Sequence, residues 1–167
     1  MVKNDWIRIV VAYEHFDDGM RARQMMDRIA RRLEPGCCID SELWDFDLMA
    51  DRSLSQDAAI AVREADMIIM AVRSELPGHV RDWLEQWASR ERTGPVSIVV
   101  LREPEQRAED LRVLLAYLQE LATRGGADFF SHNQDPETEG EWPLEETPLW
   151  FHRDMLKRRY EIFDHRQ

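Results

Sequence analysis

The sequence predicts a three-layer α/β domain, with a doubly wound, five-stranded parallel sheet of order 2-1-3-4-5 and helices on both faces. The first reason is that short apolar runs alternate along the chain with longer segments of helical periodicity. The second is residues 67–72, where six consecutive apolar residues are typical of a central strand buried on both faces. Right-handed crossovers leave few topologies for such a chain, and we choose the one in which strands one and three are neighbours.

The first predicted strand is residues 6–13, which are rich in β-branched and aromatic side chains. A helix should follow, capped by the carboxylate of Asp17 or Asp18 and ended by Pro35-Gly36. Apolar residues at helical spacing predict the face of this helix that packs inward: Ala22, Met25, Met26, Ile29, Ala30 and Leu33.

The second predicted strand is residues 37–46, where apolar and acidic residues alternate. Because Asp40 and Glu42 would face water, we expect this strand at an edge of the sheet. Ser53 or Ser55 is placed to begin the next helix. The predicted inward face of that helix is Leu54, Ala58, Ala61, Val62 and Ala65.

The central strand leads into a third helix, in which Val80, Leu84 and Trp87 recur at helical spacing. Trp83 and Trp87 lie four positions apart on it, and we expect one to pack inward and the other to be exposed. Residues 96–101 predict the fourth strand. A long helix after Asp110, a stop at Gly125-Gly126 and a short fifth strand at 127–130 complete the alternation. The apolar stripe of the long helix is Leu111, Leu114, Leu115, Leu118, Leu121 and Ala122.

The end of the chain departs from this rhythm. Residues 131–147 are acidic and rich in turn-forming residues, which predicts a loop. Thr147-Pro148 is typical of a helix start and predicts a C-terminal helix over 148–164. We expect residues 1–167 to form a single domain.

Composition limits the classes of function. A net charge of −11 would repel a polyanion, which argues against nucleic-acid binding. No apolar run approaches the roughly 20 residues that span a bilayer and no signal peptide is visible, so we expect no membrane association and a cytoplasmic location. The two cysteines, Cys37 and Cys38, are adjacent. This spacing suits neither a disulfide framework nor a zinc site and predicts buried thiols.

Residues 65–85 combine Ala65-Asp66, an apolar strand and the run Pro77-Gly78-His79-Val80-Arg81-Asp82-Trp83-Leu84-Glu85. This segment resembles the NAD(P)H-dependent FMN reductase branch of the flavodoxin-like proteins. That family has Ala-Asp, an apolar strand, a flavin-contacting loop and then Pro-Gly-x-Leu-Lys-x-x-x-Asp. Here Val80, Arg81 and Glu85 stand for the leucine, lysine and aspartate. The resemblance, which covers about residues 6–132 in order and spacing, implies a flavodoxin-like fold that binds FMN at the carboxyl edge of the sheet.

If FMN binding is retained, the resemblance places the cofactor against residues of the loops at that edge. The candidate cofactor-binding residues are His15, Phe16, Gly19, Arg73, Ser74, Glu75 and Arg102. Yet all three flavin loops differ from the family's. Residues 14–19 are acidic where the family has Ser, Thr, Arg and Gly. Residues 73–76 form a shorter loop without an aromatic side chain, and residues 102–107 contain no glycine.

The acidic turn is the strongest argument against a flavin. Glu14, Asp17 and Asp18 would engage the free N–H groups of the helix N-terminus and repel a phosphate. At 4 to 6 Å and an effective dielectric near 20, each repulsion is roughly 3 to 4 kcal/mol before screening. Micromolar FMN binding totals about 8 kcal/mol.

We therefore expect a flavodoxin-like binding or regulatory module that has lost the FMN site and needs no cofactor. The alternative is an NAD(P)H-dependent FMN reductase or quinone reductase that holds FMN at the carboxyl edge. No residue stands out as catalytic, and no spacing of histidines, cysteines or carboxylates predicts a metal site.

Two other interpretations depend on the acidic residues. A receiver domain of a two-component system would need an aspartate where strand three ends, but the chain has Val72-Arg73 there. Arg73 would instead pair with Glu14. A hydrolase or metal site could use the acidic edge, and Glu14, Glu75 and Glu103 could crowd enough to raise a carboxyl pKa. We expect Arg73 and Arg102 to neutralise these carboxylates.

The long helix has an apolar arc wider than one packing face needs. Val113 and Tyr117 fall outside its main stripe of leucines. Two packing surfaces suggest self-association, a habit that the resembled family shares, and we expect a homodimer.

Overall fold

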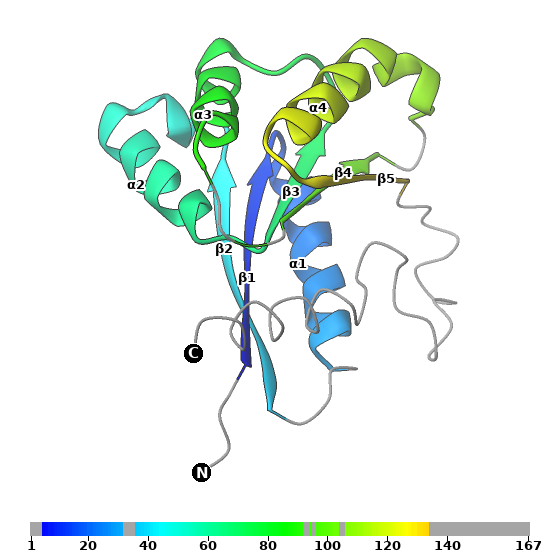
Figure 1. Cartoon of the computed structure of the whole chain (residues 1–167). Helices are drawn as coiled ribbons and strands as arrows, with labels where there is room; N and C mark the ends of the chain where they lie inside the picture. The colour runs from blue at the N-terminus through cyan, green and yellow to red at the C-terminus, as the bar shows by residue number, and fades with distance from the viewer. Residues whose placement is uncertain (1–4, 32–35, 92–93, 95, 104–105, 134–167) are drawn as a thin grey trace.

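The computed structural model describes residues 5–31, 36–91, 94, 96–103 and 106–133, and these form a five-stranded parallel sheet of order β2-β1-β3-β4-β5 (Figure 1). The predicted fold class and strand order are confirmed. The strands are β1 (Asp5–Tyr13), β2 (Cys37–Asp45), β3 (Met67–Val72), β4 (Ser97–Arg102) and β5 (Asp128–Asn133).

The centre of the sheet is β3, whose six residues are all buried. It pairs with β1 on one side, with Val11 opposite Ile69, and with β4 on the other, with Val99 opposite Ile69. At the edge, β2 is only partly buried, as its alternation of apolar and acidic residues predicts.

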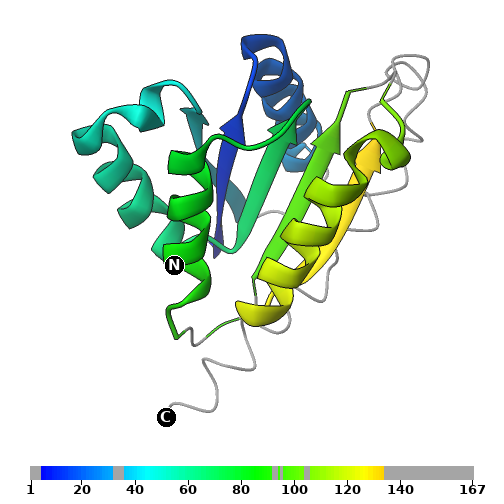
Figure 2. The ribbon, with the colours of Figure 1, turned by 90° about the horizontal axis from the view of Figure 1, so that it is seen from above.

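Helices cover both faces of the sheet. They are α1 (Phe16–Ala30), α2 (Arg52–Arg63), α3 (Gly78–Ala88) and α4 (Arg112–Arg124). Figure 2 shows α1 on one face and α2, α3 and α4 on the other. Each face has its own hydrophobic core: Met25 and Met26 of α1 pack against one side of the sheet, and Leu84 and Leu118 belong to the core on the other side.

Two predicted helix starts are wrong. α1 begins at Phe16, so Asp17 and Asp18 lie in its first turn and neither is the cap. α2 is capped by Asp51, whose side chain accepts hydrogen bonds from the backbone N–H groups of Ser53 and Leu54, at 2.9 and 3.1 Å. A carboxylate that reaches two free N–H groups at a helix N-terminus is also favoured by the helix dipole.

Burial corrects three further expectations. Trp83 and Trp87 are both buried, because α3 packs with α2 and α4 as well as on the sheet. The cysteines Cys37 and Cys38 are only partly buried, since they lie on the edge strand β2. In α1, Ala22, Met25 and Met26 are buried as predicted, whereas Ala30 is exposed.

The last described elements differ in their bounds from the prediction. A short 3₁₀ turn, Ala108–Leu111, precedes α4, and β5 extends to Asn133, into the range predicted as a loop. The remaining loop residues 134–147, the predicted C-terminal helix 148–164, Leu33 and the side chain of Ile29 lie outside what the structure describes. Within the described part of the chain, none of the helices is both long and apolar enough to cross a membrane.

Candidate functional site

The carboxyl ends of the parallel strands carry the candidate site. Only Glu14 and His15 separate β1 from α1, so the chain turns sharply there. The backbone N–H of Glu14 donates to the carbonyl oxygen of Ala71 at 3.0 Å, which extends the pairing of β1 with β3 by one residue. The Glu14 side chain is therefore directed at the end of β3.

The carboxylate of Glu14 takes the hydrogen-bond donors at the end of β3. Its Oε2 atom accepts from the backbone N–H groups of Arg73 and Ser74, at 2.7 and 3.1 Å, and its Oε1 atom accepts from the Ser74 hydroxyl at 2.5 Å. Charge-assisted bonds of this kind are stronger than those between neutral groups. The Glu14 carboxylate thus accepts the hydrogen bonds that an anionic ligand at this position would accept.

The side chain of Arg73 contacts Asp18 in α1 and Glu103, which follows β4, and so joins these two segments. Its Nε and Nη2 atoms donate to the two carboxylate oxygens of Asp18, at 2.7 and 3.1 Å, and its Nη1 atom lies 3.2 Å from Oε1 of Glu103. Asp18 is only 7% exposed and has a second cation, Arg21, at 3.6 Å. The hydrogen bond with Asp18 raises the pKa of Arg73 above its ordinary value.

The predicted ion pair between the Arg73 side chain and Glu14 is therefore wrong. Glu14 binds the backbone of Arg73, and Asp18 binds its guanidinium group. Arg73 does pair with one of the edge carboxylates, Glu103, as predicted. Arg102 forms no ion pair with any carboxylate that the structure describes. Its Nε atom donates to the hydroxyl of Ser131 at 3.1 Å, and its Nη1 atom lies 3.4 Å from the carbonyl oxygen of Gln106. Sequence patterns gave no signal for Gln106, whose side-chain amide donates to the carbonyl oxygen of Arg73.

Gly19 has a packing role in this turn. A Cβ atom added at Gly19 would lie 2.9 Å from the ring of Tyr13, so glycine is needed for the ring to lie against α1. Burial, and then the nearby Asp45, raise the pKa of that tyrosine. Gly19 thus explains the position of the Tyr13 ring and makes no opening for a ligand.

The other candidate cofactor-binding residues are exposed around this cluster. Phe16, at the start of α1, is 69% exposed, and the half-exposed ring of His15 lies with its Nε2 atom 3.9 Å from Glu14. Ser74 is exposed but donates to Glu14, and Glu75 is exposed. Among the described residues, no group of three or more histidines, cysteines and carboxylates could hold a metal ion.

The segment that resembles the flavin reductases holds helices together. Near the start of α3, the His79 ring contacts the carbonyl oxygen of Phe46, with Nε2 at 2.6 Å. Arg81 lies over the ring of Tyr117, 5.3 Å from its centroid. Glu85 accepts hydrogen bonds from Arg124 at 2.8 and 3.0 Å and from the Tyr117 hydroxyl at 2.9 Å.

These contacts shift the pKa values of Glu85, Tyr117 and Arg124, the last of which is raised by its hydrogen bond with Glu85. The hydrogen bonds from Arg124 and then Tyr117 lower the pKa of Glu85, and burial together with Glu85 raises the pKa of Tyr117 to about 12. The positions equivalent to the family's lysine and aspartate, Arg81 and Glu85, therefore join α3 to α4.

Comparison with known proteins identifies the fold. No family model matches the sequence, and no curated protein matches it. Among solved structures, a flavodoxin, WrbA-like protein from Agrobacterium tumefaciens superposes with a TM-score of 0.52 at 16% identity, covering 80% of this chain and 85% of that one. A flavodiiron protein from Giardia intestinalis gives 0.51 at 11% identity, covering 98% of this chain and 38% of that one.

A third structure, general stress protein 14 from Treponema denticola in complex with FMN, gives a TM-score of 0.46 at 12% identity, covering 98% of this chain and 99% of that one. The two superpositions above 0.5, together with the strand order, show a flavodoxin-like fold. They show the fold alone, and the function has to be argued from the site.

Proposed function

We propose that this chain, which has a flavodoxin-like fold, is a binding or regulatory module whose carboxyl edge does not take FMN. One observation carries the proposal. The carboxylate of Glu14 accepts three hydrogen bonds from Arg73 and Ser74, at the edge where the fold would receive an anionic group. A flavin phosphate would have to displace a charged group of the protein that already accepts three hydrogen bonds.

Charge around the turn supports the same conclusion. Glu14, Asp17 and Asp18 lie in or next to the first turn of α1, where an incoming phosphate would meet the helix N-terminus. Of these, Glu14 and Asp17 form no ion pair with an arginine among the described residues, and each at 4 to 6 Å would cost roughly 3 to 4 kcal/mol at an effective dielectric near 20, before screening. Arg73 and Arg21, the cations beside Asp18, already pair with its carboxylate. The residues present therefore do not fit a flavin phosphate.

Space around the turn gives a third, independent argument. Two residues between β1 and α1 leave little backbone to wrap around a phosphate, and the Tyr13 ring fills the space beside Gly19. The Arg73 side chain crosses from β3 to both α1 and the β4 loop. These contacts make the edge a closed, internally paired surface.

Titration of the purified protein with FMN, followed by flavin fluorescence, tests the proposal. We expect no saturable quenching at micromolar protein, because the anion site is taken by Glu14. Protein that is yellow when purified, or that binds FMN with micromolar affinity, would overturn the proposal. That result would favour the alternative, an NAD(P)H-dependent FMN or quinone reductase.

A further inference from the structure

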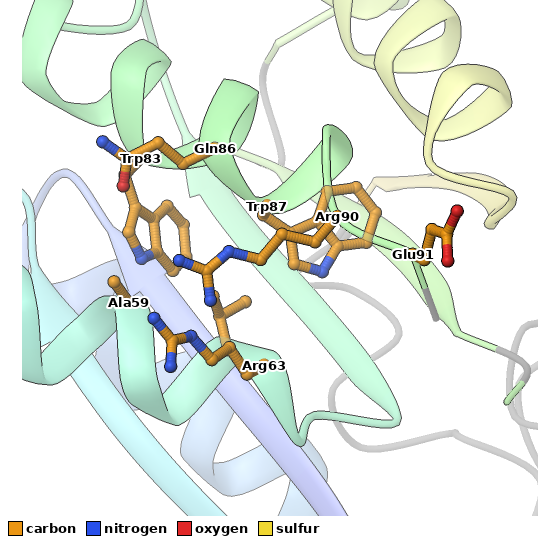
Figure 3. A pocket seen from close by; sticks show the side chains of 8 residues that line it. Ala59, Arg63, Trp83, Gln86, Trp87, Arg90 and Glu91 are labelled. Carbon is orange, nitrogen blue, oxygen red and sulfur yellow. The ribbon is translucent and has the colours of Figure 1, made fainter. Parts of the chain in front are cut away.

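A pocket between α2 and α3 contains none of the residues that form the carboxyl-edge cluster. It has a volume of about 210 Å³ and is lined by Ala59, Val62, Arg63, Trp83, Gln86, Trp87, Arg90 and Glu91. Figure 3 shows its floor, formed by the indole rings of Trp83 and Trp87, with the long side chains of Arg63 and Arg90 extending across it. The pocket combines an apolar floor with a charged rim.

The first argument is an unpartnered donor. Trp83 is 2% exposed, and its indole Nε1 atom has no hydrogen-bond partner. Buried N–H groups are nearly always bonded, so this donor beside a cavity is available to an acceptor from outside the chain. In Figure 3 the indole nitrogen is on the side of the ring that faces Ala59 and Arg63.

The second argument is charge. Arg63, at the end of α2, and Arg90, just after α3, are exposed, and neither forms an ion pair with any residue that the structure describes. The acidic residue of the lining is Glu91, which Figure 3 shows beyond Trp87, at the far end of the pocket. Two guanidinium groups and an indole N–H are all donors, which suits a carboxylate.

We propose that this pocket binds a small organic anion, a carboxylate carried on one flat apolar ring. The carboxylate accepts from Arg63, Arg90 and the Trp83 indole, and the ring packs on Val62 and the tryptophan faces. The volume is below the roughly 300 Å³ at which sites for drug-sized ligands begin, so the ligand has a single ring. This site lies on a helical face, apart from the carboxyl edge, and does not depend on the proposed loss of FMN.

The test uses benzoate as the probe and NMR of the tryptophan indole N–H groups as the readout. We expect a saturable shift of one indole N–H signal, which Trp83→Phe removes. Arg63→Gln and Arg90→Gln should each weaken benzoate binding about tenfold, as expected for the loss of a charge-assisted hydrogen bond. Arg112→Gln removes an exposed arginine from α4, outside the pocket, and should leave the affinity unchanged.

A neutral probe and an inorganic probe test separately whether the ligand needs the ring and whether it needs the negative charge. Benzyl alcohol has the ring without the charge, and inorganic phosphate has charge without the ring, so both should bind at least tenfold more weakly than benzoate. The proposal fails if benzoate gives no saturable shift up to about 10 mM, well above the millimolar range of weak specific binding. It fails equally if benzyl alcohol or phosphate binds as well as benzoate, or if Arg112→Gln matches the loss seen for Arg63→Gln. Because both arginines are exposed, their variants keep the test valid even if Trp83→Phe does not fold.

Discussion

Arg73 and Asp18 form an ion pair with two hydrogen bonds, of 2.7 and 3.1 Å, between residues that are 55 positions apart in the sequence. Asp18 is almost fully buried in the first turn of α1, and Arg73 follows β3. The same guanidinium group reaches Glu103, after β4. One side chain thus fixes the relative positions of a helix and two strand ends at the carboxyl edge.

Removing the buried carboxylate should destabilise the protein. We expect Asp18→Asn to lower the free energy of unfolding by about 1 to 3 kcal/mol, less than for a fully buried pair because Arg73 stays partly solvated. Glu64→Gln is the matched control, since it breaks the pair with Arg8 on an exposed surface and should cost about 0 to 1 kcal/mol. Urea unfolding of both variants measures the difference. Equal losses would mean that the contact with Arg73 adds no more stability than an exposed ion pair does.

Opening the anion position should raise the affinity for phosphate. Glu14→Ser frees the backbone N–H groups of Arg73 and Ser74 and removes one negative charge. We expect it to bind inorganic phosphate about tenfold more tightly than the unsubstituted chain, as expected for hydrogen bonds to a charged group. Asp17→Ser removes a charge from the same turn. We expect Asp17→Ser to raise the affinity for phosphate less than Glu14→Ser does, because it frees no backbone N–H groups. Calorimetry measures both affinities. Equal gains in affinity would show that charge alone keeps phosphate away.

Replacing Gly19 by alanine should lower the free energy of unfolding. Its Cβ atom would lie 2.9 Å from the Tyr13 ring, close to where that ring joins the chain, so the ring must move. We expect Gly19→Ala to destabilise the fold by about 1 to 3 kcal/mol, the usual cost of overpacking. At Gly78, the first residue of α3, nothing lies within 4 Å of an added Cβ atom. Gly78→Ala is the control and should be neutral or stabilising by up to about 1 kcal/mol. Thermal unfolding of both variants and of the unsubstituted chain measures these changes in the free energy of unfolding.

The homodimer stays a prediction, and the structure narrows where it could form. Tyr117 is engaged with Glu85 and Arg81, which leaves Val113, 80% exposed on α4, as the apolar side chain of that arc still facing solvent. If α4 carries the contact, sedimentation should show a dimer at tens of micromolar and a monomer for Val113→Glu. A wild-type monomer at that concentration would contradict the expected homodimer.

Local patterns predicted the fold well because burial leaves a clear mark on composition. The unbroken apolar run of β3 predicted a central strand, and the alternation of apolar and acidic residues in β2 predicted an edge strand. Both positions in the sheet are observed. The partners of individual charges could not be predicted in this way. Whether Asp18 caps a helix or pairs with Arg73 depends on contacts between distant segments, and the pattern around residue 18 is the same in either case.

The same limit explains the tryptophans and the helix cap. Periodicity showed that Trp83 and Trp87 lie on nearby faces of α3, but both become buried because α2 and α4 pack beside it. Ser53 and Asp51 are both good capping residues by composition. The path of the backbone after the 3₁₀ turn Leu48–Ala50 selects Asp51.

The burial of Tyr117 and its hydrogen bond with Glu85 should make stability depend on pH in the alkaline range. The pKa of Tyr117 is raised from 10.0 to about 12 in the folded protein, by burial and by Glu85. A group whose pKa is higher when folded stabilises the fold below its unfolded value and loses that contribution as pH rises through the folded value. The loss should therefore fall between pH 10 and about 12, and amount to about 1 to 2 kcal/mol after allowance for solvent screening.

Tyr117→Phe provides the control, because it removes the ionisable group while keeping the ring that packs under Arg81. Urea unfolding of both proteins at several pH values gives the free energy of unfolding, and the difference between them cancels the contribution of Tyr13, whose pKa is also raised. We expect the advantage of the unsubstituted chain to shrink as pH rises above 10. An advantage that stays constant across this range would show that folding does not raise the pKa of the Tyr117 hydroxyl.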